Sequence, residues 1–243
     1  MSNKGKGICL SLGGIVAFIG WILYQVTFIG NAENDDIAAL MGNAEGGTVM
    51  ATVVILLIII GLPMVVAGLR GIKGQAGGTF ETLGIGFVTL GVIVFIATIG
   101  ILGTHVTMAD KLGTYMAGIA VATEAGDAAS IAKYADAAAA AQISTGAVQA
   151  FNVAAGNIGS LLWGAGFFCI GVAYTCNSSF KGIIPAIPLG PLGIIIGILI
   201  IVSVLIIDPT AGSSTAGLVG GIGFAISVIW ATLVGAKLYT SSD

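Results

Sequence analysis

One short stretch combines residue types that could bind a metal or transfer a proton. His105 is the single histidine of the 243 residues, and Met108 and Asp110 follow it within six positions. Histidine and methionine are ligands that suit copper, and a lone imidazole can also sense pH. We nevertheless predict no metal, cofactor or catalytic residue, because a single histidine is poor support for a metal site or a catalytic base and Met108 suits an apolar interface. An independent membrane enzyme that uses His105 is therefore the least favoured functional hypothesis.

Cysteines and glycines give no stronger signal. Cys169 and Cys176 lie seven residues apart, without the close spacing of a zinc site, and we expect them and Cys9 to be reduced, buried thiols that act as small hydrophobes. The glycine-rich stretch 217–223 is not followed by the lysine and hydroxyl residue of a phosphate-binding loop.

The composition of the chain is that of a membrane protein. Hydrophobic residues make up 57% of the chain and charged residues 8%, whereas a soluble domain has roughly 25% charged residues. Six uncharged apolar runs each reach the ~20 residues that cross ~30 Å of hydrocarbon as a helix. The predicted spans are Ile8–Gly30, Thr48–Leu69, Thr82–Gly103, Ala155–Cys176, Pro185–Ile207 and Thr215–Ala236. We predict an all-α, integral membrane six-helix bundle that forms a single transmembrane domain over residues 1–243.

Residues 104–154 form an alanine-rich external segment between the third and fourth spans. Alanine has the highest helix propensity, so residues 130–142 are expected to be helical, with Asp127 as an acidic cap at the start. We expect one or two short external helices on the mouth of the bundle, the last of which could continue into the fourth span.

The charges divide by sign between the two sides of the predicted bundle. Six of the eight basic residues fall on the side of the termini: Lys4, Lys6, Arg70, Lys73, Lys181 and Lys237. Nine of the eleven acidic residues fall on the other side: Glu33, Asp35, Asp36, Glu45, Asp110, Glu124, Asp127, Asp136 and Asp208. Basic residues stay on the cytoplasmic side, which predicts a cytoplasmic (plasma) membrane protein with both termini in the cytoplasm. Nucleic-acid binding is not expected, because no basic patch is present.

Two series of small residues recur at helical spacing. Gly223, Ser227, Ala231 and Gly235 follow one another every four residues in the sixth span, and Gly156, Ser160 and Gly164 do so in the fourth. Small residues at this spacing allow helix backbones to approach closely in lipid. The series predict either contacts within the bundle or an interface with another subunit.

Prolines mark the start of the fifth span. Pro185, Pro188 and Pro191 lie close together, so regular helix is expected to begin near Pro188 or Pro191, where a proline fits the first turn. The alternative is a broken helix that lines a substrate route, as in some transporters. No span contains an ionisable residue that an ion-coupled transporter would need.

One stretch of the chain is similar to a known family. The stretch 159–164 (GSLLWG), the stretch 171–174 (GVAY), Phe180–Lys181 and Ile184–Pro185 resemble the second half of six-helix prokaryotic membrane proteins known as domain of unknown function 4386. The similarity covers about residues 155–207. The chain departs from that pattern in lacking an arginine before Phe180 and in its alanine-rich segment. The resemblance implies an architecture and a prokaryotic source but no activity.

These observations leave two functional hypotheses ahead of the enzyme. The first is an accessory subunit without a catalytic centre, which packs through its small-residue faces against other integral membrane subunits of a larger assembly. The alternative is a transporter or channel for a small neutral solute or lipid. Both place the chain in a lipid bilayer without a cofactor.

Overall fold

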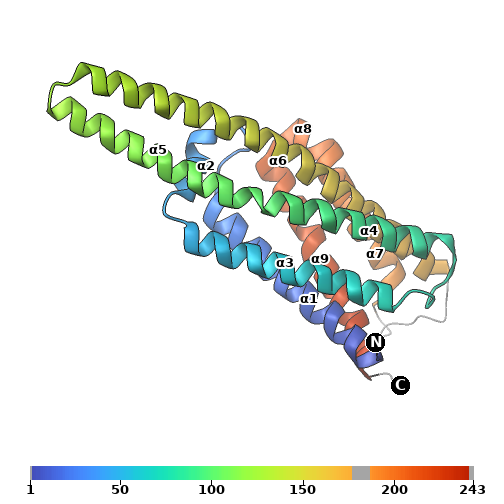
Figure 1. The fold of residues 1–243 in the computed structure, drawn as a ribbon. Helices are drawn as coiled ribbons and strands as arrows, with labels where there is room; N and C mark the ends of the chain where they lie inside the picture. The colour runs from blue at the N-terminus through green and yellow to red at the C-terminus, as the bar shows by residue number, and fades with distance from the viewer. Residues whose placement is uncertain (1, 177–186, 241–243) are drawn as a thin grey trace.

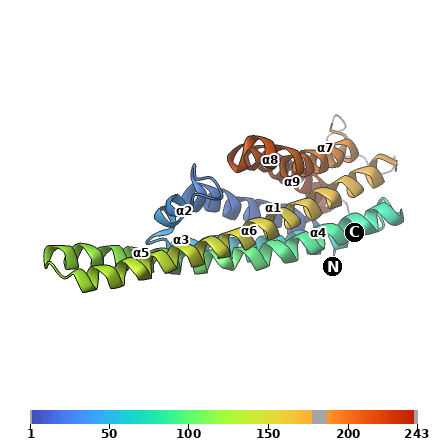
Figure 2. The same cartoon turned by 90° about the horizontal axis from the view of Figure 1, so that it is seen from above.

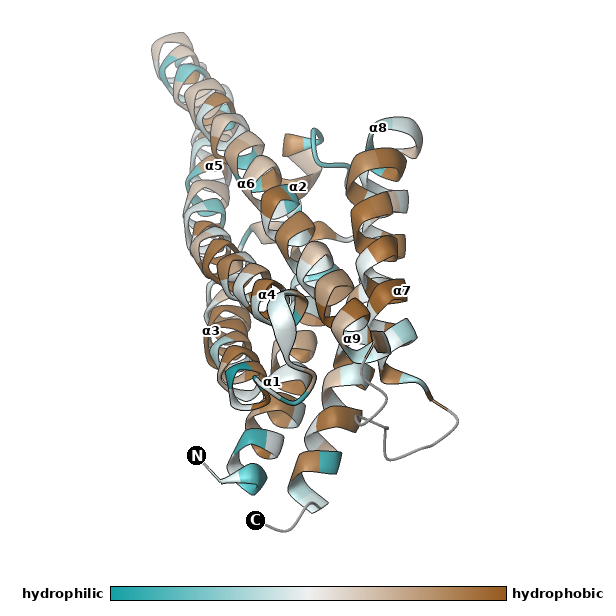
Figure 3. Ribbon diagram, turned by 90° about the vertical axis from the view of Figure 1, so that its right-hand side faces the viewer, coloured by the Kyte–Doolittle hydropathy of each residue, from teal (hydrophilic) through white to brown (hydrophobic). Residues whose placement is uncertain are grey.

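The computed structural model describes residues 2–176 and 187–240, and these residues form an all-helical bundle (Figure 1). Six helical stretches are long and apolar enough to cross a membrane, which confirms the predicted all-α six-helix bundle. Apolar residues dominate the middle of the bundle and hydrophilic ones gather at its two ends and along the projecting hairpin (Figure 3). The elements are α1 (Asn3–Tyr24), η1 (Gln25–Ile29), α2 (Ile37–Ala44), α3 (Thr48–Gly71), α4 (Gly78–Ile99), α5 (Ile101–Glu124), α6 (Ala128–Cys176), α7 (Leu189–Val202), η2 (Ser203–Ile207), α8 (Asp208–Ala211) and α9 (Ser213–Thr240).

The six crossing helices are arranged as a ring. Each packs against two neighbours in the order α1, α3, α4, α6, α7, α9 and back to α1, and the contact between α3 and α4 is the smallest. Both chain termini lie at one end of this ring, which we call the terminal end (Figure 1). The other end carries α2, α8 and the tip of the α5–α6 hairpin, and we call it the hairpin end.

The alanine-rich segment forms a long helical hairpin and not short helices on the mouth. α4 and α5 together run over Gly78–Glu124, and α6 alone has 49 residues. At 1.5 Å per residue each arm is about 70 Å long, more than twice the ~30 Å of hydrocarbon, so the hairpin projects beyond the other helices (Figure 2). The expectation of short helices is wrong because alanine favours helix throughout and no proline interrupts the segment.

The predicted helix start at Asp127 is confirmed. Asp127 Oδ1 accepts a hydrogen bond from the Ser130 amide at 3.1 Å, and Gly126 before it has φ of +68°, which allows the tight turn between α5 and α6. The Ser130 hydroxyl also donates to the carboxylate and holds the pKa of Asp127 below its ordinary value.

Glycines bring the crossing helices into backbone contact. A Cβ atom added to Gly166 of α6 would lie 2.9 Å from the Gly84 carbonyl oxygen and the Val88 amide nitrogen of α4. One added to Gly235 of α9 would lie 2.6 Å from the carbonyl oxygen of Gly7 in α1.

Most of the small-residue series therefore faces other helices of the same chain. Gly223 and Gly164 both approach Ile200 of α7, and Ala231 is buried with its methyl group near Gly14 of α1.

A buried carboxylate closes the terminal end. Glu81, near the start of α4, is 1% exposed and accepts hydrogen bonds from the amides of Gly74 at 2.7 Å, Ala76 at 3.2 Å and Gly77 at 3.1 Å. The turn between α3 and α4 is thus tied to the helix that follows it.

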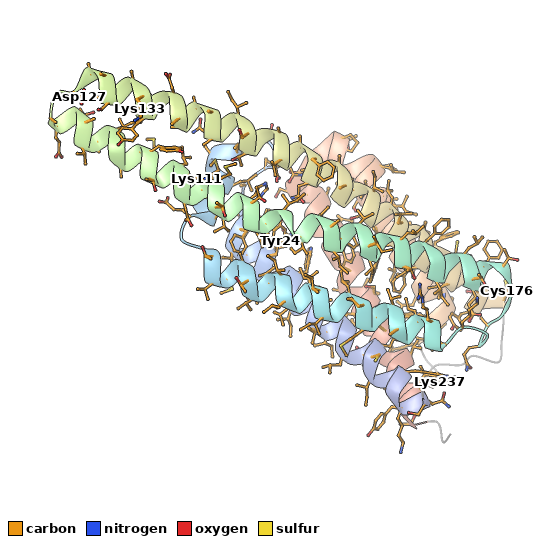
Figure 4. The ribbon with its side chains drawn as sticks, in the orientation of Figure 1. Tyr24, Lys111, Asp127, Lys133, Cys176 and Lys237 are labelled. Carbon is orange, nitrogen blue, oxygen red and sulfur yellow. The ribbon has the colours of Figure 1, made fainter. Side chains whose placement is uncertain are left out.

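Two further predictions concern the terminal end. α7 begins at Leu189 directly after Pro188, as expected, while Pro185, Phe180 and Lys181 lie outside the described residues. All three cysteines are free, but Cys176 is exposed because it is the last residue of α6 at the terminal end (Figure 4), and Cys9 and Cys169 are only half-buried. The expectation of buried thiols was therefore wrong.

Candidate functional site: a cavity within the helix ring

The ring of helices encloses a cavity of about 480 Å³. This volume lies in the range of small-molecule binding sites, roughly 300–1,000 Å³. All six crossing helices contribute to its lining, and Asn34, Asp208 and Ser213 line it in the connections at the hairpin end. Among the described residues, none of the turn 72–77 and none of the first thirteen positions line it. The cavity is thus reached from the hairpin end and stops within the bundle.

One face of α6 supplies the longest wall. Most of the lining residues on this helix follow one another at intervals of three or four, which places them on one face. They include Gln149, Asn152, Gly156, Ser160, Trp163 and Phe167. The small-residue series contribute Gly156 and Ser160 from this helix and Ser227 and Ala231 from α9 to the lining, and a Cβ atom added to Gly156 would meet no other residue within 4 Å.

Gln149 and Asn152 were assigned by sequence to the external segment. The uninterrupted α6 helix carries both of them into the cavity wall. The signal that could have found them is the three-to-four spacing itself, which runs without a break from Gln149 to Phe167 across the predicted boundary.

Aromatic rings from four helices lie deeper in the cavity. Phe224 of α9 is central, with its ring centroid 5.7 Å from Trp163, 5.8 Å from Phe95 and 6.2 Å from Trp21. All four rings line the cavity. Trp230, one turn and a half further along α9, is fully buried and donates from Nε1 to the Leu189 carbonyl at 2.9 Å. The cavity therefore gives way to a packed core toward the terminal end.

Polar side chains gather at the hairpin end of the cavity. The Tyr24 hydroxyl interacts with the Asn152 side chain, and Asn152 Nδ2 donates to Gln149 Oε1 at 3.4 Å. Asn157 Nδ2 donates to Asp208 Oδ2 at 3.4 Å. Figure 4 shows Tyr24 deep among the helices, far from the hairpin tip. Asp208 is the one charged side chain among the described lining residues, so the cavity is polar at this end but nearly uncharged.

Three buried nitrogens of the lining residues have no hydrogen-bond partner within the described part of the chain. They are Nε2 of His105, Nε2 of Gln149 and Nε1 of Trp163. A buried donor without an acceptor destabilises a fold by about 1–3 kcal/mol, so such groups call for an explanation. His105 and Gln149 lie about twenty residues on either side of the turn 125–127, which places them at the same height in the hairpin.

Two π-helical segments border the same cavity. η1 continues α1 and contributes Gln25 and Ile29, while η2 continues α7 and contributes Ser203 and Val204. Short π-helical segments within α-helices occur frequently at functional sites. No residue pattern in the sequence predicts either π-helical segment.

The predicted weak metal candidates do not converge. His105 lines the cavity, whereas Asp110 Oδ1 accepts from the Gly46 amide at 2.8 Å and Met108 packs against the core. Five residues apart on one helix, His105 and Asp110 point about 140° away from each other. No group of three histidine, cysteine, aspartate or glutamate side chains gathers in the described residues.

A second carboxylate ties the mouth of the cavity together. Glu33 accepts from the Ser213 hydroxyl and from the Ser214 amide at 3.2 Å, and the Asn34 amide donates to Ser213 Oγ at 3.1 Å. These bonds join the connection after η1 to the first turn of α9. The hydrogen bond from Ser213, with that from the Ser214 amide, lowers the pKa of the fully exposed Glu33 carboxyl.

No family model, curated protein or solved structure matches this chain. The resemblance of residues 155–207 to domain of unknown function 4386 remains a prediction. Of the residues that carry it, Trp163 lines the cavity, while Phe180, Lys181, Ile184 and Pro185 lie outside the described residues.

Proposed function

We propose that this chain is a membrane transporter or channel component that binds a small uncharged molecule in the cavity of its helix ring. The observation that carries the proposal is a cavity of about 480 Å³ to which all six crossing helices contribute, polar at one end and aromatic at the other. No lysine or arginine is among the described residues that line it. An anionic solute would therefore meet Asp208 without a compensating positive charge.

Gly156 allows a direct test of this proposal. A Cβ atom at Gly156 would meet no neighbour within 4 Å, so leucine there extends into the cavity, whereas Gly86 of α4 also has no neighbour within 4 Å but is exposed and does not line the cavity. Wild type, Gly156→Leu and Gly86→Leu are purified in parallel, and their organic extracts are compared by mass spectrometry. We expect an uncharged compound to accompany wild type and Gly86→Leu and to be depleted in Gly156→Leu. Equal recovery from all three proteins would contradict the proposal.

The accessory-subunit hypothesis remains a second candidate because of the hairpin. α2 and the connection after it approach the hairpin at Gly113 and Gly146, so residues 114–142 extend beyond them. Met116 and Val121 in this extension and Ile143 at its base are exposed apolar side chains, with Ile143 75% exposed. Such a surface suits contact with another protein chain.

The second candidate has its own test. Val121→Asp should release a co-purifying membrane subunit in mild detergent while leaving the melting temperature of this chain unchanged. Gly86→Leu again serves as the control. A wild-type protein that purifies without any stoichiometric partner would exclude this role and leave the first proposal untouched.

We further propose a cytoplasmic membrane of a prokaryote, with the terminal end in the cytoplasm. The charge asymmetry of the sequence supports this orientation. Cys176 is exposed at the terminal end, and Ala129→Cys would place a second exposed thiol at the hairpin tip. An impermeant maleimide should label the introduced thiol on intact cells and Cys176 only after membrane disruption. The reverse pattern would invert the orientation.

A further inference from the structure

The wall at the polar end of the cavity contains two buried nitrogens at one height that have no partner in the described residues. Gln149 is 2% exposed, and its Oε1 is already engaged by Asn152, so the unsatisfied group of this side chain is the Nε2 donor. His105 Nε2 on the neighbouring α5 also has no partner in the described residues. Because buried donors are normally paired, the missing partner of Gln149 is an acceptor that this part of the chain does not itself provide.

The depth of the cavity limits which groups one ligand can reach. Trp163 is fourteen residues from Gln149 on the same helix, about 21 Å at 1.5 Å per residue. A small molecule held at Gln149 therefore does not reach the Trp163 nitrogen. What lies deeper is the aromatic group, in which Phe18 and Trp21 are nearly parallel with centroids 5.8 Å apart. Such rings provide faces and edges against which a planar apolar body packs favourably.

Charge further narrows the chemistry of the ligand. Asp208 lines the polar end, and Glu33 lies at the mouth with Ser213 and Ser214, which line the cavity. Both carboxylates disfavour an anionic head group. Because Gln149 Oε1 is engaged by Asn152, the unsatisfied group of the Gln149 side chain is a donor and calls for an acceptor on the ligand.

From these observations, and resting on the proposed function of the cavity, we infer that the bound molecule is an uncharged, ring-bearing compound with a carbonyl-type oxygen. Its oxygen accepts the hydrogen bond of Gln149 Nε2 beside His105, and its ring extends inward toward the aromatic side chains. Gln149 thereby determines specificity for the acceptor, and the rings bind the apolar body.

Three naphthalene derivatives separate these contributions. 2-Acetylnaphthalene carries the carbonyl, 2-isopropenylnaphthalene has nearly the same size and shape with a methylene group in place of the oxygen, and 2-naphthoate is the anion. Binding is measured by calorimetry to the full-length protein in nanodiscs, with empty nanodiscs to subtract partition into lipid. We expect the ketone to bind wild type about tenfold more tightly than the alkene, the effect of one buried hydrogen bond, and the anion to bind most weakly.

Gln149→Met tests the residue assignment, because methionine has nearly the shape of glutamine without the donor. The tenfold preference for the ketone should fall to about one in Gln149→Met and persist in Gly86→Leu. A circular-dichroism melt of each variant verifies the fold, and binding of the alkene to Gln149→Met shows that the cavity is intact.

The outcomes distinguish the inference from the proposal on which it rests. If the ketone and the alkene bind wild type equally, or if Gln149→Met keeps the preference, the assignment of Gln149 is overturned while the cavity remains a binding site. If 2-naphthoate binds most tightly, the uncharged class is overturned. If no probe binds wild type above empty nanodiscs, the proposed function and the inference fail together.

Discussion

Two glycines of α6, ten residues apart, serve opposite purposes. Gly166 lies against the backbone of α4, where a Cβ atom would come within 2.9 Å of Gly84 and Val88. Gly156 faces the cavity, where a Cβ atom would meet nothing within 4 Å. A small residue in a membrane helix thus marks either a place where two backbones meet or a place where space is left, and only the neighbours distinguish the two.

The two ends of the bundle also differ, because one is held by a buried carboxylate and the other by an exposed one. At the terminal end, Glu81 is buried and accepts three amide hydrogen bonds from one turn. At the hairpin end, Glu33 is exposed and joins two separate connections across the mouth of the cavity. Contacts that are exposed to solvent open more readily than buried ones. The comparison suggests a closed base and a mouth that opens at lower free energy.

The largest effect on stability is expected where a larger side chain forces two packed helices apart. Gly166→Leu should destabilise the bundle by about 3 kcal/mol or more, since two of the three obstructing atoms, the Gly84 carbonyl oxygen and the Val88 amide nitrogen, are backbone and cannot rotate away. Thermal unfolding in detergent, compared with Gly86→Leu, measures the difference. A Gly166→Leu protein as stable as Gly86→Leu would contradict the close backbone contact between α6 and α4 at Gly166.

The next effect concerns the buried carboxylate. Glu81→Ala leaves three amide groups of the turn 74–77 without their acceptor, and we expect a loss of about 2–3 kcal/mol because water satisfies part of the deficit. Glu81→Gln keeps one acceptor oxygen and should lose less. Thermal unfolding gives the magnitudes, and hydrogen exchange should show faster exchange at residues 74–77. Unchanged exchange there would show that Glu81 does not hold the terminal end closed.

A side chain that extends into the cavity should stabilise the fold instead of destabilising it. Gly156→Leu is expected to raise the free energy of unfolding by about 0.5–1 kcal/mol, because leucine has a higher helix propensity than glycine and its Cβ atom would meet no neighbour within 4 Å. The measurement is the same thermal unfolding, made in the absence of any added ligand. A loss comparable to that of Gly166→Leu would mean that the space beside Gly156 is closed in solution.

The smallest effect is the pH dependence of the mouth. The folded-state pKa of Glu33 lies below its ordinary value of 4.5, so the ionised carboxylate contributes stability above pH 4.5, and that stability is lost as the pH falls through the lower folded-state pKa. Wild type should therefore exceed Glu33→Gln slightly in melting temperature at pH 7, with the difference vanishing only below pH 4.5. Ser213→Ala, which removes the main donor, should show the same loss. A difference that grows on acidification would contradict the assigned hydrogen bonds.

Sequence reasoning anticipated the number and positions of the crossing helices and allowed the last external helix to continue into the fourth span, as α6 does, but it did not anticipate that the external segment is one long hairpin. The apolar runs sufficed to identify each crossing, because the length of a membrane helix follows from the thickness of hydrocarbon. The Asp127 cap and the helix start after Pro188 could also be predicted from the sequence, since both depend on local residues. The site was not anticipated: Gln149 and Asn152 were assigned to an external segment, and both π-helical segments lack a sequence signal.

What the sequence by itself determined is a set of six apolar helices, because burial of apolar residues in lipid and backbone hydrogen bonding within each helix are local requirements. The tertiary structure alone decided the closing of those helices into a ring, the meeting of Trp21, Phe95, Trp163 and Phe224, and the burial of Gln149 Nε2 without a partner in the described residues. Each depends on which helix lies opposite which, and in lipid that choice is made by the close fit of facing surfaces and not by hydrophobicity, which is nearly equal all round these helices.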